Sequence, residues 1–223
     1  MIDPSVPAVI EMVDLALRSY FLTPASEHQL NTTDEVHEAI RSLTVSKTPG
    51  PNGIPNRTLK HLLKRAVSLL AHIFNAVLRN HHSPPQVLKH NRVISIFKPE
   101  KDPVLPSSYP PISLLDTTVK LFEKILLARI LHVVRERGLI RDEQFGFRPI
   151  HSTSLQLTGL VERITWNFGE KRFTGADFLD VAKAFDTVWI DGLLYKLTLP
   201  NLPSYIVHSL SSYIWSRIFE ASS

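Results

Sequence analysis

Apolar residues recur at spacings of three and four along residues 59–77, which predicts an amphipathic helix with one apolar face. We expect this helix to be interrupted at most once and to stop before Ser83-Pro84-Pro85, because proline disfavours helix. The predicted apolar face consists of Leu59, Leu62, Leu63, Ala66, Leu70, Ile73, Phe74 and Val77. Several lysines and arginines of the segment lie off that face.

Four further helices are predicted, over residues 5–20, 34–43, 117–137 and 151–168. Local capping residues support the last three of these helices. The residues concerned are Thr32 or Thr33 before the second helix, Ser152 or Thr153 before the fourth, and Gly138 at the end of the third. Asp34 and Glu35 in the first turn of the second helix complement its dipole.

Two segments read as strands, residues 92–98 and 173–181, because both are rich in β-branched or aromatic residues. Proline-rich loops are predicted over residues 47–55 and 99–111, since three prolines and two glycines in nine residues exclude a helix or a central strand from the first. The pattern shows no internal repeat. It predicts a mixed, mostly helical fold.

Composition narrows the class of protein. The chain has 223 residues, 43% of them hydrophobic, which is enough to bury a core. It has no cysteine, so disulfides and thiolate metal sites are excluded. No apolar run approaches the roughly 20 residues of a membrane span, and the N-terminus lacks the features of a secretory signal. We therefore expect an intracellular protein without a membrane partner, in the nucleus or the cytoplasm.

The net charge of +4 is distributed unevenly along the chain. Residues 1–43 carry seven acidic and two basic residues, residues 44–101 carry one acidic and ten basic residues, and residues 102–223 are balanced at thirteen of each. A local excess of nine positive charges is a candidate phosphate-binding surface. The alternative is a solvated helix face balanced by an acidic neighbour, and charge alone favours neither.

One segment carries candidate chemistry. Residues 178–186 combine an apolar strand that ends in Asp180 with a tight turn, the aromatic Phe185 and a second acid, Asp186. A carboxylate at the end of a strand can point into a cleft, where it suits Mg²⁺ and two-metal phosphoryl transfer. The alternative is that Asp180 caps the next helix while Asp186 lies in solvent, and spacing alone favours that alternative.

Four blocks, in order, resemble the reverse transcriptases of non-LTR retrotransposons of the jockey-like group. They are KTPGPNGIPNRTLK (47–60), RVISIFKPEKDPVLPSSYPPISLL (92–115), EQFGFRPIHST (143–153) and FLDVAKAFDTVWIDGLLYKL (178–197). The resemblance implies an α+β fold with a mostly helical fingers region and the first strand and helices of a right-hand polymerase palm. It divides the chain into an N-terminal helical extension (1–30), a fingers-like region (31–150) and the start of the palm (151–223).

The resemblance also implies an activity and roles for individual residues. The activity is RNA-templated DNA synthesis from deoxynucleoside triphosphates with Mg²⁺, so the implied partners are an RNA template and an RNA/DNA hybrid. The metal-binding, catalytic carboxylate is Asp180, beside the backbone carbonyl of Val181. Phe185 is the aromatic gate that rejects a 2′-hydroxyl by clash, Lys98 reaches the triphosphate, and Arg148 lines the template path. With the basic segment, the implied nucleic-acid contacts are Lys60, Lys64, Arg65, Lys89 and Arg92.

The chain also departs from the family's pattern. Pro110 stands where the family has arginine, so a charged triphosphate contact is lost, and Asn52 replaces an aspartate. The later Pro-Gln-Gly and Ala-Asp-Asp blocks do not occur, and the residues before Ser223 are expected to be helical. These observations predict a truncated fragment with an incomplete palm and an incomplete Mg²⁺ site, inactive on its own. The alternative is a domesticated or residual module that binds nucleic acid or protein without catalysis. Salt-dependent RNA binding separates a fragment that still binds RNA through residues 44–101 from a module that binds protein.

Overall fold

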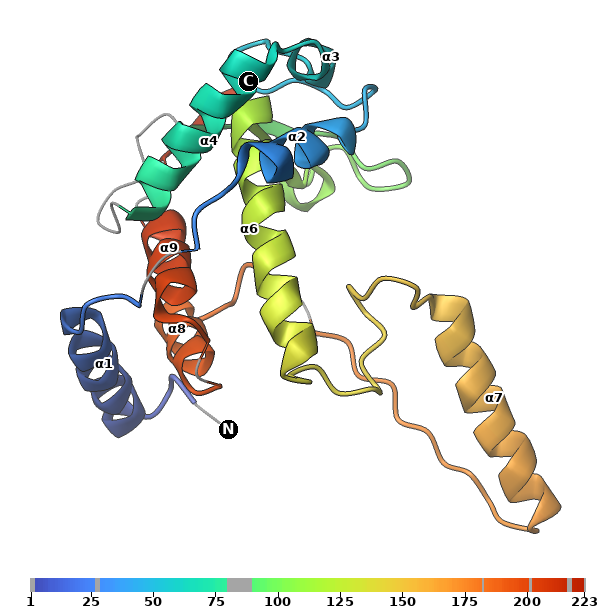
Figure 1. Ribbon diagram of the computed structural model, residues 1–223. Coiled ribbons are helices and arrows are strands. Elements are labelled where there is room, and N and C mark those ends of the chain that lie inside the picture. The colour runs from blue at the N-terminus through green and yellow to red at the C-terminus, as the bar shows by residue number, and fades with distance from the viewer. Residues whose placement is uncertain are drawn as a thin grey trace. The chain divides into compact units, whose positions relative to one another are not determined.

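The chain folds into two units of unequal size. The computed structural model describes residues 3–26, 29–79, 90–181, 183–200, 202–215 and 218–222. One unit combines Met1–His132 with Ile190–Ser223, and the second unit is Val133–Trp189. The helices are α1 (Pro7–Leu22), α2 (Thr33–Arg41), α3 (Asn56–Lys60), α4 (Lys64–Arg79), α6 (Thr117–Glu136), α7 (Thr153–Gly169), α8 (Ile190–Thr198) and α9 (Ser204–Ile214) (Figure 1). The strands are β1 (His90–Ser95), β2 (Pro111–Leu115) and β3 (Ile218–Ser222). Helices thus dominate a mixed α+β arrangement.

The predicted helix starts are confirmed where a polar side chain caps them. Thr32 and Glu35 form a reciprocal capping box at the start of α2: the Thr32 hydroxyl accepts from the Glu35 amide at 3.1 Å, and the Glu35 carboxylate accepts from the Thr32 amide at 2.7 Å. Ser152 caps α7 by accepting from the Leu155 amide at 3.2 Å. In both cases the capping hydroxyl and the amide from which it accepts are three residues apart in the sequence, which is why the residue types alone reveal the cap.

Gly138 ends α6 as predicted, in a left-handed conformation with φ of 58°. The Gly138 amide donates to the Arg135 carbonyl at 3.2 Å, and the Leu139 amide donates to the Val134 carbonyl at 3.0 Å. This pair of bonds is a Schellman motif, which satisfies carbonyls that the end of a helix would otherwise leave without a partner.

The main core lies in the first unit, between α2, α3, α4, α6 and the end of α9. It is built from Val36, Ile40, Leu43, Leu59, Val67, Ala71, Phe74, Val77, Leu78, Val119, Leu121, Phe122, Ile125, Leu126 and Tyr213. The Phe74 and Phe122 rings meet at its centre, with centroids 5.3 Å apart. The Tyr213 hydroxyl donates to the Glu123 carboxylate, which ties α9 to α6.

The predicted apolar face of residues 59–77 is partly wrong. The helix is interrupted once, as predicted, between α3 and α4, so Leu63 precedes α4 and is exposed, and Ile73 is exposed as well. The buried positions of α4 are instead Val67, Ala71, Phe74, Val77 and Leu78. The apolar stripe of α4 is broad enough for several orientations, and packing against its neighbouring helices selects one of them.

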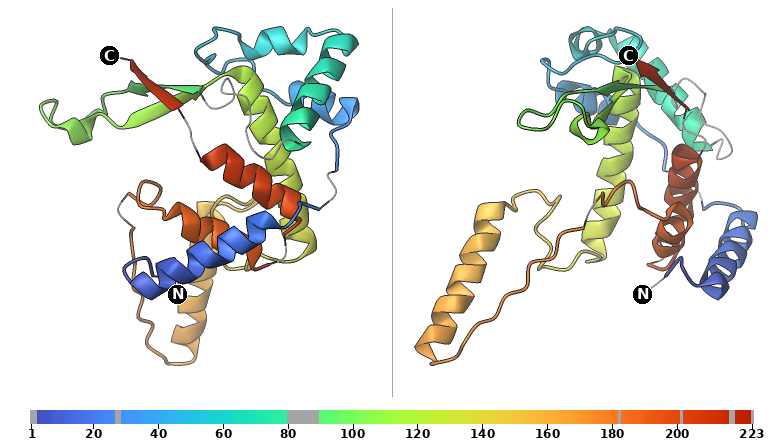
Figure 2. Two further views of the ribbon diagram at one scale, coloured as in Figure 1. Left: turned by 90° about the vertical axis from the view of Figure 1, so that its left-hand side faces the viewer. Right: turned by 180° about the vertical axis from the view of Figure 1, so that it is seen from behind.

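The three strands form one sheet in the order β2-β1-β3, in which β1 pairs antiparallel with β2 and parallel with β3. The strand predicted over residues 92–98 is confirmed as β1, although β1 ends at Ser95. Pairing continues past Ser95, since the Lys98 amide donates to the Ser108 carbonyl at 2.8 Å. Figure 2 shows the resulting hairpin extending away from the helices. The expected helical end of the chain is wrong, because residues 218–222 pair with β1 as β3.

A second packed cluster in the first unit joins α1, α8 and α9. Its buried residues include Val13 and Leu17 of α1, Leu194 of α8, and Ile206 and Val207 of α9. Among the residues that the structure describes, no helix combines the length and apolarity needed to cross a membrane.

The second unit has no core of its own among its described residues, none of which is buried. Its main element is α7, followed by residues 172–180 without regular secondary structure. The strand predicted over residues 173–181 is therefore wrong. A strand needs a neighbour for its backbone N–H and C=O groups, and no described strand pairs with this segment.

Candidate functional site

The motif segment 178–186 is exposed along its described length. Asp180 and Val181 lie in irregular backbone, and a turn follows in which the Asp186 and Thr187 amides donate to the Lys183 carbonyl at 2.9 and 3.1 Å. Because a turn and not a helix follows Asp180, the alternative interpretation of Asp180 as a helix cap does not hold. The next helix, α8, begins only at Ile190.

Phe185 is brought together with one other motif block. Its ring lies edge-on to the Phe147 ring, with centroids 6.3 Å apart and an angle of 82° between the planes. Both rings are otherwise exposed, Phe185 at 81% and Phe147 at 92%. Phe147 was not among the predicted site residues, and its position beside Arg148 in the EQFGFRP block was the available signal.

Arg148 organises the loop in which it lies. Its guanidinium donates to the Arg141 carbonyl at 2.9 Å and to the Gln144 carbonyl at 3.4 Å, and it lies 3.8 Å from the Asp142 carboxylate. These contacts use much of its donor capacity inside residues 141–148, so any contact with a template would be made by the donors that remain.

The motif segment does not make a complete metal site from the described residues. Nowhere in the described ranges do three acidic or histidine side chains gather as ligands. Asp180 and the Val181 carbonyl offer two oxygens, whereas Mg²⁺ takes six ligands in near-octahedral geometry. The residues present therefore do not by themselves fit the ion that the resemblance implies.

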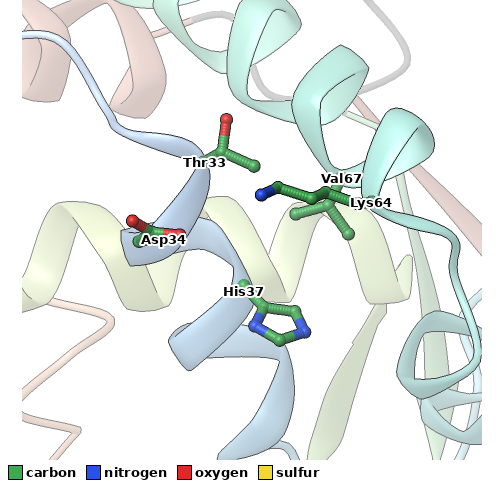
Figure 3. Close-up of a pocket in the computed structure, with 5 residues that line it drawn as sticks. All are labelled: Thr33, Asp34, His37, Lys64 and Val67. Atoms are coloured by element: carbon green, nitrogen blue, oxygen red, sulfur yellow. The ribbon is translucent and has the colours of Figure 1, made fainter.

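The predicted basic contacts Lys60 and Lys64 lie on either side of His37, in a groove between α2 and the α3–α4 segment. One hollow of about 280 Å³ is lined by Thr33, Asp34, His37, Lys64 and Val67, and Figure 3 shows the Lys64 ammonium directed across it toward α2. A second hollow, of about 190 Å³, shares His37 and Val67 and is lined also by Lys60 and Arg41. The lysines and His37 offer donors to a phosphate, while Asp34 opposes an anion at one end.

Lys60 also has a structural contact, since its ammonium donates to the Arg41 carbonyl at the end of α2, at 2.8 Å. Arg65 is exposed on the first turn of α4, and Arg92 and Lys98 are exposed along the hairpin. The first unit thus contains five predicted basic contacts, Lys60, Lys64, Arg65, Arg92 and Lys98, whereas Arg148, Asp180, Val181 and Phe185 belong to the second unit. Lys89 lies outside the described residues.

The KTPGPNGIP loop docks on the junction between β2 and α6. The Asn52 amide donates to the Asp116 carboxylate at 2.9 Å, the Thr117 hydroxyl donates to the Ile54 carbonyl at 2.6 Å, and the Lys120 ammonium donates to the Thr48 carbonyl at 2.9 Å. A Cβ added at Gly50 would meet backbone atoms of Asp116 and Leu115 at 2.4 Å. Sequence reasoning missed Asp116, Thr117 and Lys120, since more than 60 residues separate each from its partner in the loop.

Comparison with known proteins identifies several relatives. A family model described as reverse transcriptase (RNA-dependent DNA polymerase) matches residues 96–222. The chain is 42% identical over 187 residues to the probable RNA-directed DNA polymerase from transposon BS of Drosophila melanogaster, an alignment that covers 83% of this chain and 20% of the relative. It is 39% identical over 165 residues to the RNA-directed DNA polymerase from mobile element jockey of Drosophila funebris, covering 74% of this chain and 18% of the relative. The chain thus spans about one fifth of the length of the curated relatives it matches.

Proposed function

The chain belongs to the reverse transcriptase (RNA-dependent DNA polymerase) family, and we propose that it supplies the fingers region and the first catalytic motif of a mobile-element RNA-directed DNA polymerase. In this proposal residues 1–30 are an N-terminal extension, residues 31–150 the fingers and residues 151–223 the start of the palm. The partners are an RNA template and an RNA/DNA hybrid, and deoxynucleoside triphosphates are the substrates of the whole polymerase.

The roles proposed for individual residues follow the motif matches. Asp180 and the Val181 carbonyl are this chain's contribution to a Mg²⁺ site that needs further ligands. Phe185 is the sugar gate, and its exposed ring, held against Phe147, leaves a face for a nucleotide sugar. Lys98 reaches the triphosphate. Arg148 orders the loop of residues 141–148, which lines the path of the template. With Pro110 in place of arginine, Lys98 carries more of the triphosphate contact.

The observation that carries the binding part of the proposal is that Lys60 and Lys64 both line the groove between α2 and the α3–α4 segment. Each lysine lines a hollow to which His37 also contributes, and Arg65, which follows Lys64 in the sequence, is exposed. They lie within the segment that carries ten basic residues against one acidic residue. When clustered cations bind the phosphates of RNA, they displace the counterions that surround the RNA. The chain should therefore bind single-stranded RNA with little sequence preference and with an affinity that depends strongly on salt.

The test is RNA binding by the 223-residue polypeptide as a function of salt. The triple variant Lys60→Glu, Lys64→Glu, Arg65→Glu should bind single-stranded RNA more weakly, and the slope of log affinity against log salt should fall by about 2, at roughly 0.7 per phosphate contact. The matched control reverses Arg163, Lys171 and Lys196, which are exposed and outside the basic segment. It lowers the net charge by the same amount and should retain most of the affinity.

Equal losses in the two triple variants would mean that overall charge, and not this groove, controls binding. Circular dichroism of both variants checks folding, since Lys60 also contacts the end of α2. A flat salt profile in the parent chain would contradict nucleic-acid binding and favour the alternative of a protein-interaction module without catalysis. That alternative would draw on the exposed apolar side chains of the second unit, such as Phe173, Phe178 and Leu179.

For catalysis we expect the polypeptide of these 223 residues to extend no primer on an RNA template. Two-metal phosphoryl transfer needs carboxylates around both ions, and the chain contains no Ala-Asp-Asp turn to join Asp180. Primer extension with Mg²⁺ and with Mn²⁺ tests this, with Asp180→Ala as the control. Extension that disappears in Asp180→Ala would show that the site is completed in another way.

A further inference from the structure

An aromatic pair lies on the hairpin beyond the end of β1. The antiparallel register pairs Ser95 with Pro111, and the bond from the Lys98 amide to the Ser108 carbonyl continues it. Phe97 and Tyr109 are therefore directly opposite each other. Their ring centroids are 5.4 Å apart and the planes are inclined by 49°. Cross-strand aromatic pairs stabilise a hairpin, so a packing role is the first explanation to consider.

Exposure separates this pair from the packed aromatic pair of the core. The Phe74 and Phe122 ring centroids are 5.3 Å apart, nearly the same separation, and these two residues are only 1% and 2% exposed. Phe97 and Tyr109 remain 41% and 37% exposed. Each ring covers part of the other and leaves the rest to solvent. A pair that served packing alone would gain more from burial, because burying aromatic surface is favourable.

Cations accompany the pair along the same hairpin. Arg92, Lys98 and Lys101 are exposed, against the acids Glu100 and Asp102. The Asp102 carboxylate is engaged locally, since it accepts from the Val104 amide at 2.9 Å. The hairpin is thus positive only by a small margin, which is too little to hold a polyanion by charge alone. Stacking on an aromatic ring needs no net charge, and nearby cations need only reach the flanking phosphates.

We propose that Phe97 and Tyr109 form a stacking platform for an unpaired base of single-stranded RNA. Lys101, in the loop of the same hairpin, contacts an adjacent phosphate, while Lys98 keeps its proposed role toward the triphosphate. This inference rests on the proposed function, in which RNA is the partner, and adds a base contact to the phosphate contacts of the groove between α2 and α4. Every base has a π-face, so the platform accepts all four bases with little discrimination.

The test compares two ligands with equal numbers of phosphates, an oligouridylate and an abasic oligonucleotide of the same length. The 223-residue chain should bind the oligouridylate more tightly. Tyr109→Ala should lose most of that preference, with affinity for the oligouridylate falling about five-fold or more. Tyr109→Phe is the matched control, because it keeps the ring and should keep the preference. Phe97→Leu keeps apolar bulk in the hairpin and should also reduce the preference.

The outcomes separate the two proposals. Charge reversal of Lys60, Lys64 and Arg65 should weaken both ligands alike, whereas Tyr109→Ala should spare the abasic ligand and leave the salt slope unchanged. Equal affinity of the parent chain for both ligands, or a base preference that survives both Tyr109→Ala and Phe97→Leu, would overturn the platform while leaving salt-dependent RNA binding intact. Failure of the parent chain to bind either ligand would overturn the platform and the proposed function together.

Discussion

Replacing Gly50 with alanine tests the docking of the KTPGPNGIP loop on the start of α6. The new Cβ would lie 2.4 Å from the Cα and N atoms of Asp116 and from the Leu115 carbonyl oxygen, whereas ordinary contact begins at 3.4 Å. All three are backbone atoms at the junction of a strand and a helix, so none can rotate aside. The loop must therefore move away by about 1 Å.

The cost can be worked out from the bonds that such a shift breaks. Two partly buried hydrogen bonds are at risk. The Asn52 amide donates to the Asp116 carboxylate at 2.9 Å, and the Thr117 hydroxyl donates to the Ile54 carbonyl at 2.6 Å. A neutral hydrogen bond contributes about 0.5–1.5 kcal/mol, and a bond to a charged group about 1.5–3 kcal/mol. Since Asp116 is only 6% exposed, it would lose a partner in a place that water reaches poorly. We expect Gly50→Ala to reduce the free energy of unfolding by roughly 2–4 kcal/mol.

Urea unfolding followed by far-UV circular dichroism measures this change. Gly53→Ala is the matched control in the same loop. A Cβ there meets no atom within 4 Å, and only the φ of 69° opposes it, at a cost of about 1–2 kcal/mol. Gly159→Ala, in α7 and in open space, should cost nothing. If Gly50→Ala lowers the free energy of unfolding by no more than Gly53→Ala does, the close approach of the loop to the start of α6 is refuted.

Three further predictions concern other contacts. Asn52→Asp should lower the free energy of unfolding by roughly 1 kcal/mol at neutral pH, because it places a second carboxylate near Asp116. Urea unfolding measures the change, and Asp116→Asn in the same chain should remove it. Arg129→Ala should lower the free energy of unfolding by about 2–3 kcal/mol, because its buried guanidinium donates to the Gln29 carbonyl and pairs with Glu35 at 3.3 Å. Thermal unfolding should show Arg129→Lys recovering part of the loss, and equal stability of the alanine variant would contradict the contact. Phe185→Val, in a chimera whose later palm comes from an intact relative, should admit ribonucleotides during primer extension, and unchanged discrimination would assign the ring to packing.

Local signals in the sequence predict local structure well here. The capping box of Thr32 and Glu35, the Ser152 cap and the Gly138 end of α6 each depend on groups within five residues of one another. Such groups are close together in the sequence whatever the tertiary fold is, so their residue types alone predict where the helix begins or ends.

Features that depend on distant partners could not be predicted in this way. The orientation of α4 is set by neighbouring helices, and β3 exists because it pairs with β1, which precedes it by about 130 residues. The contact between Arg129 and the Gln29 carbonyl spans 100 residues, and that between Asn52 and Asp116 spans 64. Nothing in the neighbourhood of Asp116 in the sequence indicates that a glycine of another block must pack against its backbone.

The motif segment shows how a family pattern and a local geometry can differ. Residues 173–181 have the composition of a strand, and the resemblance of residues 178–197 to a catalytic motif carries the assignment of Asp180. Residues 173–181 nevertheless have no regular structure in this chain. A strand is stable only when a neighbour accepts and donates its backbone hydrogen bonds, and the second unit offers none among its described residues. Apolar strand positions such as Phe178 and Leu179 then have no face to pack against and remain exposed. In this chain, therefore, the motif sequence alone does not fix the direction of the Asp180 carboxylate, because no described strand pairs with the segment that carries it.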